Sequence, residues 1–316
     1  MRERYVGRSG LQVPRLGLGT WSWGRTTDEH EAPDVLRAYL DAGGYLLDTA
    51  PTYAGGASEE LLGRMLGTVV RREEVVIASK AGLKVTSRGK VADTSRRSML
   101  ARLDDSLRRL GTDHLDLWQV HRWSPDVPLD ETLSALDVAV TSGRVRYVGV
   151  SNYAGWQTAL AHAWQTSAAG RAAIVSTQVE YSLLNRDVEH EVVPAAEALG
   201  VGVLAWSPLG RGVLTGKYRH GIPSDSRAAS DDMASFVDPY LDDHGARVTE
   251  AVVRAADGLG LSPVEVALAW VRDRPGVTSV LLGARTADQL RACLSVEKVE
   301  LPAEIVRALD DVSAGG

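Results

Sequence analysis

The chain has 316 residues, of which 44% are hydrophobic and 24% charged, so it can bury the core of one large domain or two ordinary ones. Its net charge of −6 is spread without long runs of one sign, which argues against nucleic acid or an anionic membrane surface as a partner. No signal peptide or membrane-spanning run is visible, and the single cysteine, Cys293, excludes internal disulfides and suits a reducing cytosol, so we expect a cytoplasmic protein.

Short apolar runs alternate with amphipathic stretches along the chain. Before the first run, RYVGRSGLQVPRL (4–16) predicts a small hairpin that turns at Ser9–Gly10 and caps the bottom of the fold. The apolar runs predict strands at 15–19, 45–48, 75–80, 115–120, 145–150, 175–180, 201–206 and 277–283. The amphipathic stretches predict helices at 28–42, 58–66, 95–111, 130–142, 187–199, 247–259, 286–295 and 302–312, with candidate starts at Asp28, Ser58, Asp130 and Ser262–Pro263.

Eight strand–helix units predict a parallel sheet, because parallel strands need crossover helices. The count of eight favours closure into a (β/α)8 TIM barrel over an open doubly wound sheet. We expect one domain over 1–316. The longest irregular stretch, 207–244, is rich in Gly, Pro, Ser and Asp, and loops of that length in compact domains usually carry function.

Polar side chains stand at the carboxyl ends of the predicted strands. In chain order they are Asp48, Lys80, His121, Ser151–Asn152, Gln178, Trp206 and Gly283-Ala284-Arg285. Because the carboxyl ends of barrel strands form the catalytic face, we expect these residues to converge, with Tyr53 folding back over the same mouth. Each alone has an ordinary interpretation, such as a helix cap for Asp48, a packed surface tyrosine for Tyr53 or a core histidine for His121.

Together these residues suit proton delivery to a carbonyl oxygen. An ammonium near a phenol favours the phenolate and so lowers the pKa of the tyrosine. Asp48 would pair with Lys80, and His121 would hydrogen-bond and orient the carbonyl. A lysine at a barrel mouth is also compatible with a Schiff-base lyase, so that alternative stays open.

Seven stretches carry a recognisable order. They are DTAPTYAGGASEELLG (48–63), VVIASKAG (75–82), LDLWQVH (115–121), VRYVGVSNY (145–153), QVEYSLLNR (178–186), VLAWSPLGRGVLTGKY (203–218) and VLLGARTADQL (280–290). In this order they resemble the aldo-keto reductase superfamily, over nearly the whole chain. Within the superfamily, the sequence most resembles bacterial members and the β subunits of voltage-gated potassium channels.

The resemblance implies an NADPH-dependent enzyme that reduces aldehydes and ketones, with a small-molecule carbonyl as substrate. Its catalytic tetrad would be Tyr53 as proton donor, Lys80, Asp48 and His121. The residues implied to bind the cofactor are Gly19, Thr20, Trp21, Asp48, Ser151, Asn152, Gln178, Trp206, Ser207, Leu209, Gly210, Gly212, Lys217, Gly283, Arg285 and Gln289. Trp206 would stack on the nicotinamide and Arg285 would grip the adenosine 2′-phosphate. The substrate pocket would be lined by Trp21, Trp23, Tyr53, His121 and Trp123.

Two departures from the family pattern stand out. Ala292 and Cys293 replace an acidic residue and an asparagine that related members often place near the adenine, which weakens the preference for NADPH over NADH. The chain ends at Gly316 without the long carboxyl-terminal loop of aldose-reductase-like members, so the substrate walls should come from Trp23, Trp123 and residues 207–244.

Other kinds of site find less support. The histidines show no ligand spacing and there is one cysteine, so we expect no metal. GLGT and GRGVLTG do not have the GxGxxG spacing, so the nicotinamide cofactor rests on the resemblance alone. A regulatory subunit that holds the cofactor remains an alternative, and a homo-oligomer is compatible with the sequence.

Overall fold

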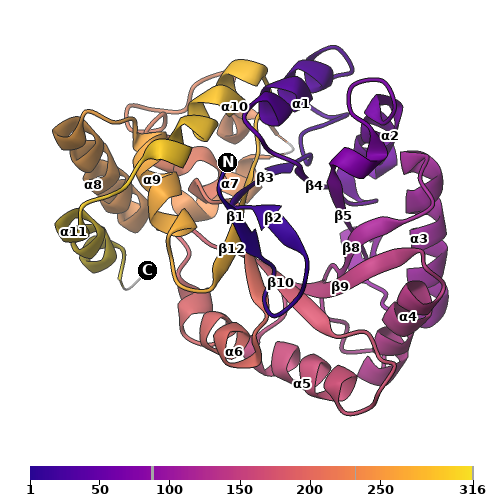
Figure 1. The fold of residues 1–316 in the computed structure, drawn as a ribbon. Coiled ribbons are helices and arrows are strands. Elements are labelled where there is room, and N and C mark those ends of the chain that lie inside the picture. The colour runs from indigo at the N-terminus through magenta and orange to yellow at the C-terminus, as the bar shows by residue number, and fades with distance from the viewer. Residues whose placement is uncertain (87–88, 232, 315–316) are drawn as a thin grey trace.

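A closed barrel of eight parallel strands forms the centre of the molecule (Figure 1). The computed structural model describes residues 1–86, 89–231 and 233–314, so the chain end at Gly316 lies outside it. Around the barrel the strands follow the order β10 (Ile174–Glu180), β11 (Gly202–Trp206), β12 (Val277–Leu282), β3 (Leu16–Gly19), β4 (Leu46–Asp48), β5 (Val76–Ala81), β8 (Leu115–Val120) and β9 (Val145–Ser151). Pairing of β9 with β10 closes the ring, and the predicted TIM barrel is confirmed.

Helices surround the strands: α1 to α6 each follow a strand, α7 to α9 all follow β11, and α10 and α11 follow β12. They are α1 (Glu31–Asp41), α2 (Ala57–Met65), α3 (Arg96–Leu110), α4 (Leu129–Thr141), α5 (Gly155–Thr166), α6 (Val192–Leu199), α7 (Ala234–Val237), α8 (Asp243–Leu259), α9 (Pro263–Arg272), α10 (Ala287–Leu294) and α11 (Ala303–Ser313). The predicted start of α9 is confirmed, since Ser262 and Glu265 form a reciprocal capping box. The start predicted at Ser58 is wrong: α2 begins at Ala57, and the Ser58 hydroxyl turns inward onto Thr20.

Helix α5 was not predicted, and its surface explains why. Trp156, Leu160 and Trp164 are 56%, 49% and 41% exposed, whereas the buried residues of the helix are small or polar: Gly155, Thr158, Ala161 and Gln165. Periodicity misleads in such a helix, because the large apolar residues do not mark its buried face.

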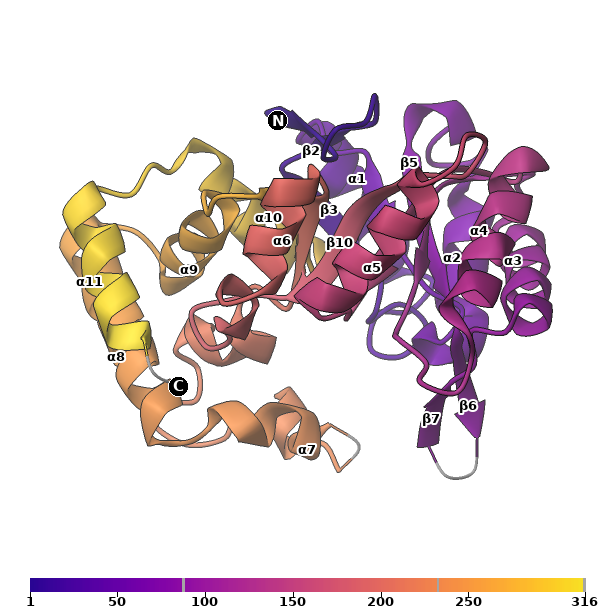
Figure 2. The ribbon, with the colours of Figure 1, turned by 90° about the horizontal axis from the view of Figure 1, so that it is seen from below.

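The amino-terminal hairpin closes one end of the barrel. Strands β1 (Glu3–Tyr5) and β2 (Gln12–Pro14) pair antiparallel, with Ser9 and Gly10 in the turn between them. Its buried residues Val6, Leu11 and Val13 pack on side chains that fill the barrel interior, namely Leu46, Ala78, Leu117, Val175, Leu204 and Leu281. The hairpin crosses the front of the barrel in Figure 1 and lies at the top of Figure 2, as predicted.

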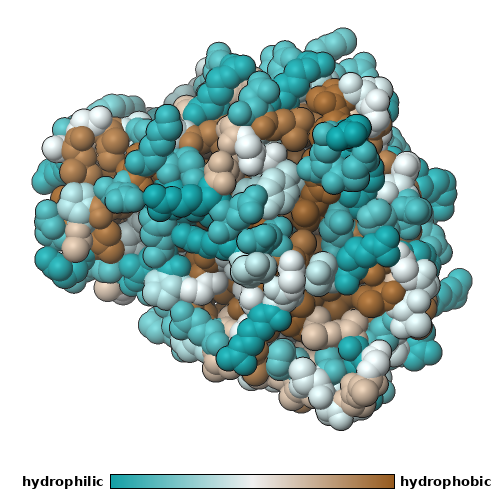
Figure 3. Space-filling view, in the orientation of Figure 1, coloured by the Kyte–Doolittle hydropathy of each residue, from teal (hydrophilic) through white to brown (hydrophobic). Residues whose placement is uncertain are grey.

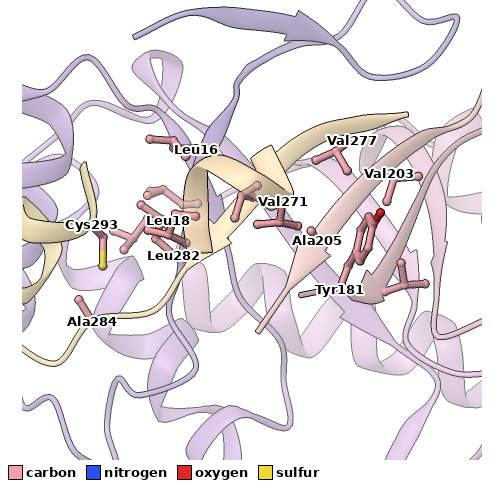
Figure 4. Packing of buried hydrophobic residues seen from close by; sticks show 14 of the residues in the cluster. Leu16, Leu18, Tyr181, Val203, Ala205, Val271, Val277, Leu282, Ala284 and Cys293 are labelled. Atoms are coloured by element: carbon pink, nitrogen blue, oxygen red, sulfur yellow. The ribbon is translucent and has the colours of Figure 1, made fainter. Parts of the chain in front are cut away.

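The main core lies between the barrel and its helices. Figure 4 shows part of it, with Leu18, Leu282 and Ala205 of the strands grouped with Val271 of α9 and Cys293 of α10. On the hairpin face of the molecule, the surface is largely hydrophilic with hydrophobic residues visible in the gaps (Figure 3). The barrel strands face this core on one side and the barrel interior on the other, so both of their sides are buried. This accounts for the nearly continuous apolar runs in the sequence.

A second hairpin, which the sequence did not predict, follows β5. Strands β6 (Leu83–Thr86) and β7 (Gly89–Ala92) pair antiparallel and project from the end of the barrel opposite the amino-terminal hairpin. Helix α7, within the long 207–244 stretch, lies at the same end (Figure 2). These two segments flank the carboxyl ends of the strands, where the predicted polar residues stand.

Candidate active site

A buried ion pair joins two neighbouring strands at the barrel mouth. Nζ of Lys80, at the end of β5, lies 2.6 Å from Oδ1 of Asp48, the last residue of β4, and their side chains are 1% and 3% exposed. The backbone carbonyl of Thr49 accepts a further hydrogen bond from Nζ at 3.0 Å. Burial alone would lower the pKa of Lys80, but the charge of Asp48 and the Tyr53 oxygen outweigh it and raise that pKa. Lys80 is therefore an ammonium at neutral pH.

Tyr53 is the third partner of this ammonium. Its hydroxyl lies 3.2 Å from Lys80 Nζ, although Tyr53 belongs to the loop after β4 and Lys80 to β5. Burial raises the pKa of Tyr53, the Lys80 ammonium opposes that rise, and Asp48 adds to it. The Lys80 ammonium thus acts on the pKa of Tyr53 in the direction that the sequence predicted. The prediction that this pKa is lowered overall is wrong, because burial raises it by more than the ammonium lowers it. The phenol stays protonated at neutral pH.

His121 follows β8 and faces Tyr53. The two rings stand edge to face with their centroids 6.3 Å apart. Burial, and then the charge of Lys80, hold the pKa of His121 well below its usual value, so the imidazole is neutral. Its Nδ1 is buried without a hydrogen-bond partner, and a neutral imidazole offers one donor and one acceptor.

The next strand ends form a connected polar row. Gln178 Nε2 donates to the second carboxylate oxygen of Asp48 at 2.7 Å, and Ser151 Oγ donates to the Gln178 carbonyl at 2.9 Å. Asn152 Nδ2 donates to the His121 carbonyl at 3.0 Å, while Trp206 Nε1 donates to Asn152 Oδ1 at 3.2 Å. The sequence placed these residues at one rim, but it did not predict that Gln178 would hydrogen-bond Asp48.

Left-handed backbone marks the loop after β11. Ser207, Gly210, Arg211 and Gly212 have φ of 51°, 53°, 59° and 101°, and Lys217 lies close to Gly212. The N–H groups of Gly210 and Gly212 donate to the carbonyls of Ser207 and Leu209 at 2.9 Å each, so the chain closes these turns by itself. Leu209, between Ser207 and Gly210, is partly exposed in the same loop.

Open space lies beside the chain at the carboxyl end of β12, the last strand of the barrel. A Cβ at Gly283 would meet no atom within 4 Å, and a Cβ at Gly19 on the adjacent strand β3 would come 3.4 Å from the carbonyl of Leu282. Arg285 follows, with Nη1 donating to the Asp225 carbonyl at 3.2 Å, and Gln289 Oε1 accepts from the Arg285 N–H at 3.0 Å. The rim therefore continues without a break to residues of the long 207–244 stretch.

Comparison with known proteins agrees with this geometry. The family model for the aldo/keto reductase family matches residues 15–314. The chain belongs to the aldo/keto reductase family. It is therefore an oxidoreductase of carbonyl compounds, from a family that generally uses a nicotinamide cofactor.

Several relatives resemble this aldo/keto reductase over almost their whole length. A Bacillus subtilis (strain 168) protein named uncharacterized oxidoreductase YrpG is 36% identical, covering 100% of this chain and 97% of its own. The L-glyceraldehyde 3-phosphate reductase of Escherichia coli (strain K12) is 35% identical over 92% of this chain and 86% of its own. A probable voltage-gated potassium channel subunit beta of Oryza sativa subsp. japonica is 35% identical, covering 92% and 89% respectively.

Two residues assigned to binding are placed elsewhere in this aldo/keto reductase. Trp23 has no exposed surface and belongs to the hydrophobic core, so it cannot line an open pocket. Thr20 is also fully buried, and its hydroxyl is occupied by the Asp48 carbonyl and Ser58 Oγ, so no surface of it is open to a cofactor. Both assignments are corrected by packing, because the side chains of Thr20 and Trp23 turn into the protein while that of Trp21 between them stays partly exposed.

Trp21 follows β3 and Trp123 follows β8, and both are partly exposed. Trp123 packs edge-on against Tyr153 at 5.3 Å and Trp156 at 5.4 Å between ring centroids. Trp21 lies 5.8 Å from the ring of Phe236 in α7. Phe236 of the long stretch thus packs against Trp21, and the substrate wall at this place stays a prediction.

Arginines of the long stretch were not singled out by the sequence. Arg211 pairs with Glu180, the last residue of β10, at 2.6 Å and so ties this stretch to the barrel. The guanidinium of Arg227 lies 5.1 Å above the Trp21 ring. Burial lowers the pKa of Arg227; Tyr218 opposes this effect, and the charges of Arg285 and Arg25 add to it. The sequence did not predict that Arg25, Arg227 and Arg285 lie near one another, because an isolated arginine in a loop gives no sign of its neighbours in space.

Neither a metal centre nor a membrane span is found in the part of the chain that the structure describes. Over residues 1–86, 89–231 and 233–314, no three His, Cys, Asp or Glu side chains are grouped to bind a metal ion. No helix within those ranges has the length and apolar character needed to cross a bilayer.

Proposed function

We propose that the protein is an NADPH-dependent reductase of aldehydes and ketones, with Tyr53 as the proton donor. The observation that carries the proposal is the chain of contacts from Asp48 through Lys80 to Tyr53, at 2.6 and 3.2 Å. A buried phenol held against a permanent ammonium is a proton donor whose conjugate base is stabilised as it forms.

The residues have separable tasks in this scheme. Bound NADPH supplies the hydride that the carbonyl carbon accepts. Tyr53 gives its hydroxyl proton to the carbonyl oxygen, which completes the alcohol, and Lys80 stabilises the phenolate left behind. Asp48 keeps Lys80 charged. His121, being neutral, can hydrogen-bond the substrate oxygen and orient it without competing as an acid.

The chain's own residues fit a dinucleotide. Arg227 and Arg285 place two cations close together, and like charges that repel one another are stabilised by an anion such as the 2′-phosphate or pyrophosphate. Lys217, exposed beside Gly212 in the loop after β11, offers a further cation to the same kind of ligand. Asn152, also left-handed with φ of 54°, is exposed at the rim beside Trp206, where the amide and indole would hold the nicotinamide.

The test is oxidation of NADPH, against NADH, with a panel of aldehydes, ketones and quinones. The wild-type protein should turn over at least one class, and Tyr53→Phe should abolish turnover while NADPH fluorescence still reports binding. Full activity in Tyr53→Phe would eliminate Tyr53 as the acid.

A second candidate is a cofactor-holding regulatory subunit, which the 35% identity to the probable potassium channel β subunit of rice favours. It predicts tight NADPH binding with negligible turnover across the same panel. The alternative of a Schiff-base lyase is less well supported, because a nucleophilic lysine needs a lowered pKa and the pKa of Lys80 is raised.

A further inference from the structure

The turn that carries Tyr53 leads into α2 through left-handed backbone. Directly after Tyr53, Ala54, Gly55 and Gly56 have φ of 47°, 65° and 106°, so the chain makes three consecutive left-handed steps before α2. Such residues lie outside repetitive structure, and a left-handed alanine is strained. On the β4 side the Tyr53 N–H donates to the Ala50 carbonyl at 3.0 Å, and on the other side the location of the phenol depends on what fixes the start of α2.

Two adjacent residues, Ser58 and Glu59, fix that start. Ser58 Oγ donates to the Thr20 carbonyl at 2.8 Å and lies 3.1 Å from the hydroxyl of Thr49, whose carbonyl accepts from Lys80. Glu59 Oε1 accepts from Ser79 Oγ at 2.7 Å, and Ser79 directly precedes Lys80 on β5. The helix that follows Tyr53 is thus tied to the strand that carries its lysine partner.

Arg109, in the last turn of α3, completes the arrangement. Its Nε donates to Glu59 Oε2 at 2.8 Å and its Nη2 lies 2.6 Å from the same oxygen. Glu59 is fully buried and the Arg109 side chain is 17% exposed. A Cβ added to Gly56 would lie 3.0 Å from Cδ and Nε of Arg109, so the arginine side chain packs directly against the left-handed turn.

We propose that Glu59 and Arg109 are positioning residues that hold the Tyr53 hydroxyl at hydrogen-bonding distance from the Lys80 ammonium. This inference rests on the proposed function. Glu59 accepts a hydrogen bond from Ser79 and pairs with Arg109, and Arg109 packs on Gly56, so both act on the site through Ser79 and Gly56. A buried ion pair is poor evidence for stability, since apolar residues of the same shape often stabilise as much. The directional hydrogen bond to Ser79 and the packing of Arg109 on Gly56 give the pair a specific geometric role that apolar contacts would not supply.

The experiment compares Glu59→Gln with Glu297→Gln as a matched control. Glu297 also pairs with a buried arginine, Arg15, at 2.9 Å, but at the opposite, hairpin end of the barrel. Proteins labelled with ¹³C at the tyrosine Cζ are titrated without cofactor or substrate, and the Tyr53 signal is assigned by its loss in Tyr53→Phe. Steady-state kcat, KM and NADPH affinity are measured in parallel.

In Glu59→Gln we expect the Tyr53 signal to move and its titration midpoint to rise, because the ammonium that opposes the burial effect is less well placed. We expect kcat to fall by about 10-fold or more, part of the ~10²–10⁴ that a positioned general acid supplies, with NADPH affinity unchanged. Glu297→Gln should lower Tm and leave the Tyr53 signal in place. Ser79→Ala, a gentler change, should shift the signal in the same direction if Glu59→Gln does not fold.

An unmoved Tyr53 signal in both Glu59→Gln and Ser79→Ala, or an equal shift in Glu297→Gln, would overturn the inference. Because the titration needs no turnover, its outcome is separate from that of the proposed function. A protein that reduces no carbonyl can still show the positioning effect, and an active reductase can still lack it.

Discussion

Lys80 Nζ lies 2.6 Å from Asp48 Oδ1, and neither side chain exposes more than 3% of its surface. In this pair the carboxylate keeps the lysine charged, and the lysine in turn limits the rise in the pKa of Tyr53 that burial produces. The four residues Asp48, Lys80, Tyr53 and Gln178 form one hydrogen-bonded unit, so a change in any of them alters the proton donor.

Replacing Lys80 with methionine should damage both catalysis and stability. Tyr53 loses the cation that opposes its raised pKa, so we expect kcat/KM to fall by about 100-fold or more. The buried Asp48 carboxylate loses its counter-ion, which typically costs about 3–5 kcal/mol in the free energy of unfolding. Urea unfolding and NADPH oxidation measure the two effects, with the exposed Lys298→Met as control. Wild-type stability in Lys80→Met would show that Asp48 does not depend on this partner.

The neutral state of His121 makes stability depend on pH. Its pKa is well below the usual ~6.5 in the folded protein, so between the two values the unfolded chain binds a proton that the native state does not. Stability should therefore decline as pH falls below about 6.5, and His121→Gln should decline less over that window. The measurement is the free energy of urea unfolding at several pH values between about 5 and 7.5. Parallel curves for the two proteins would refute a buried neutral imidazole.

Arg285→Ala should weaken NADPH binding much more than NADH binding. Loss of a guanidinium contact to phosphate removes a charge-assisted hydrogen bond of about 1.5–3 kcal/mol, or about 10- to 100-fold in Kd. The matched control is Arg291→Ala, an exposed arginine of α10 that pairs with Asp288. Fluorescence titration with both dinucleotides decides the matter, and an equal loss for NADPH and NADH would remove Arg285 from the 2′-phosphate site.

Gly149→Ala should destabilise the barrel at the contact between β9 and β10. A Cβ there would lie 2.1 Å from Ser176 Oγ and 2.8 Å from the Ser176 carbonyl, so the two strands must separate. We expect a loss of about 1–3 kcal/mol, typical of overpacking. Gly258→Ala, at an open position of α8, should instead gain up to about 1 kcal/mol from helix propensity. Thermal and urea unfolding of the pair provide the comparison.

Much of the architecture could be predicted from local pattern. The strand 115–120 and helix 95–111 were located to within a residue, because a buried parallel strand is a short apolar run and an amphipathic helix repeats every 3.6 residues. The hairpin β6–β7 and helix α5 were missed. Exposed Val85 and Val91 in the former and exposed tryptophans in the latter do not follow the pattern of one buried face.

The sequence by itself determined the barrel and the residues at its rim, because a strand's direction places its last residue on a known face. Only the tertiary structure decided which of those residues touch: barrel closure brings Gln178 to Asp48 across 130 positions of chain. The tertiary structure also decided the protonation states of Tyr53 and His121. It buries Trp23 and Thr20, which the sequence had assigned to the site. Burial and partner distance are properties of the packed molecule, and no local pattern of residue types contains them.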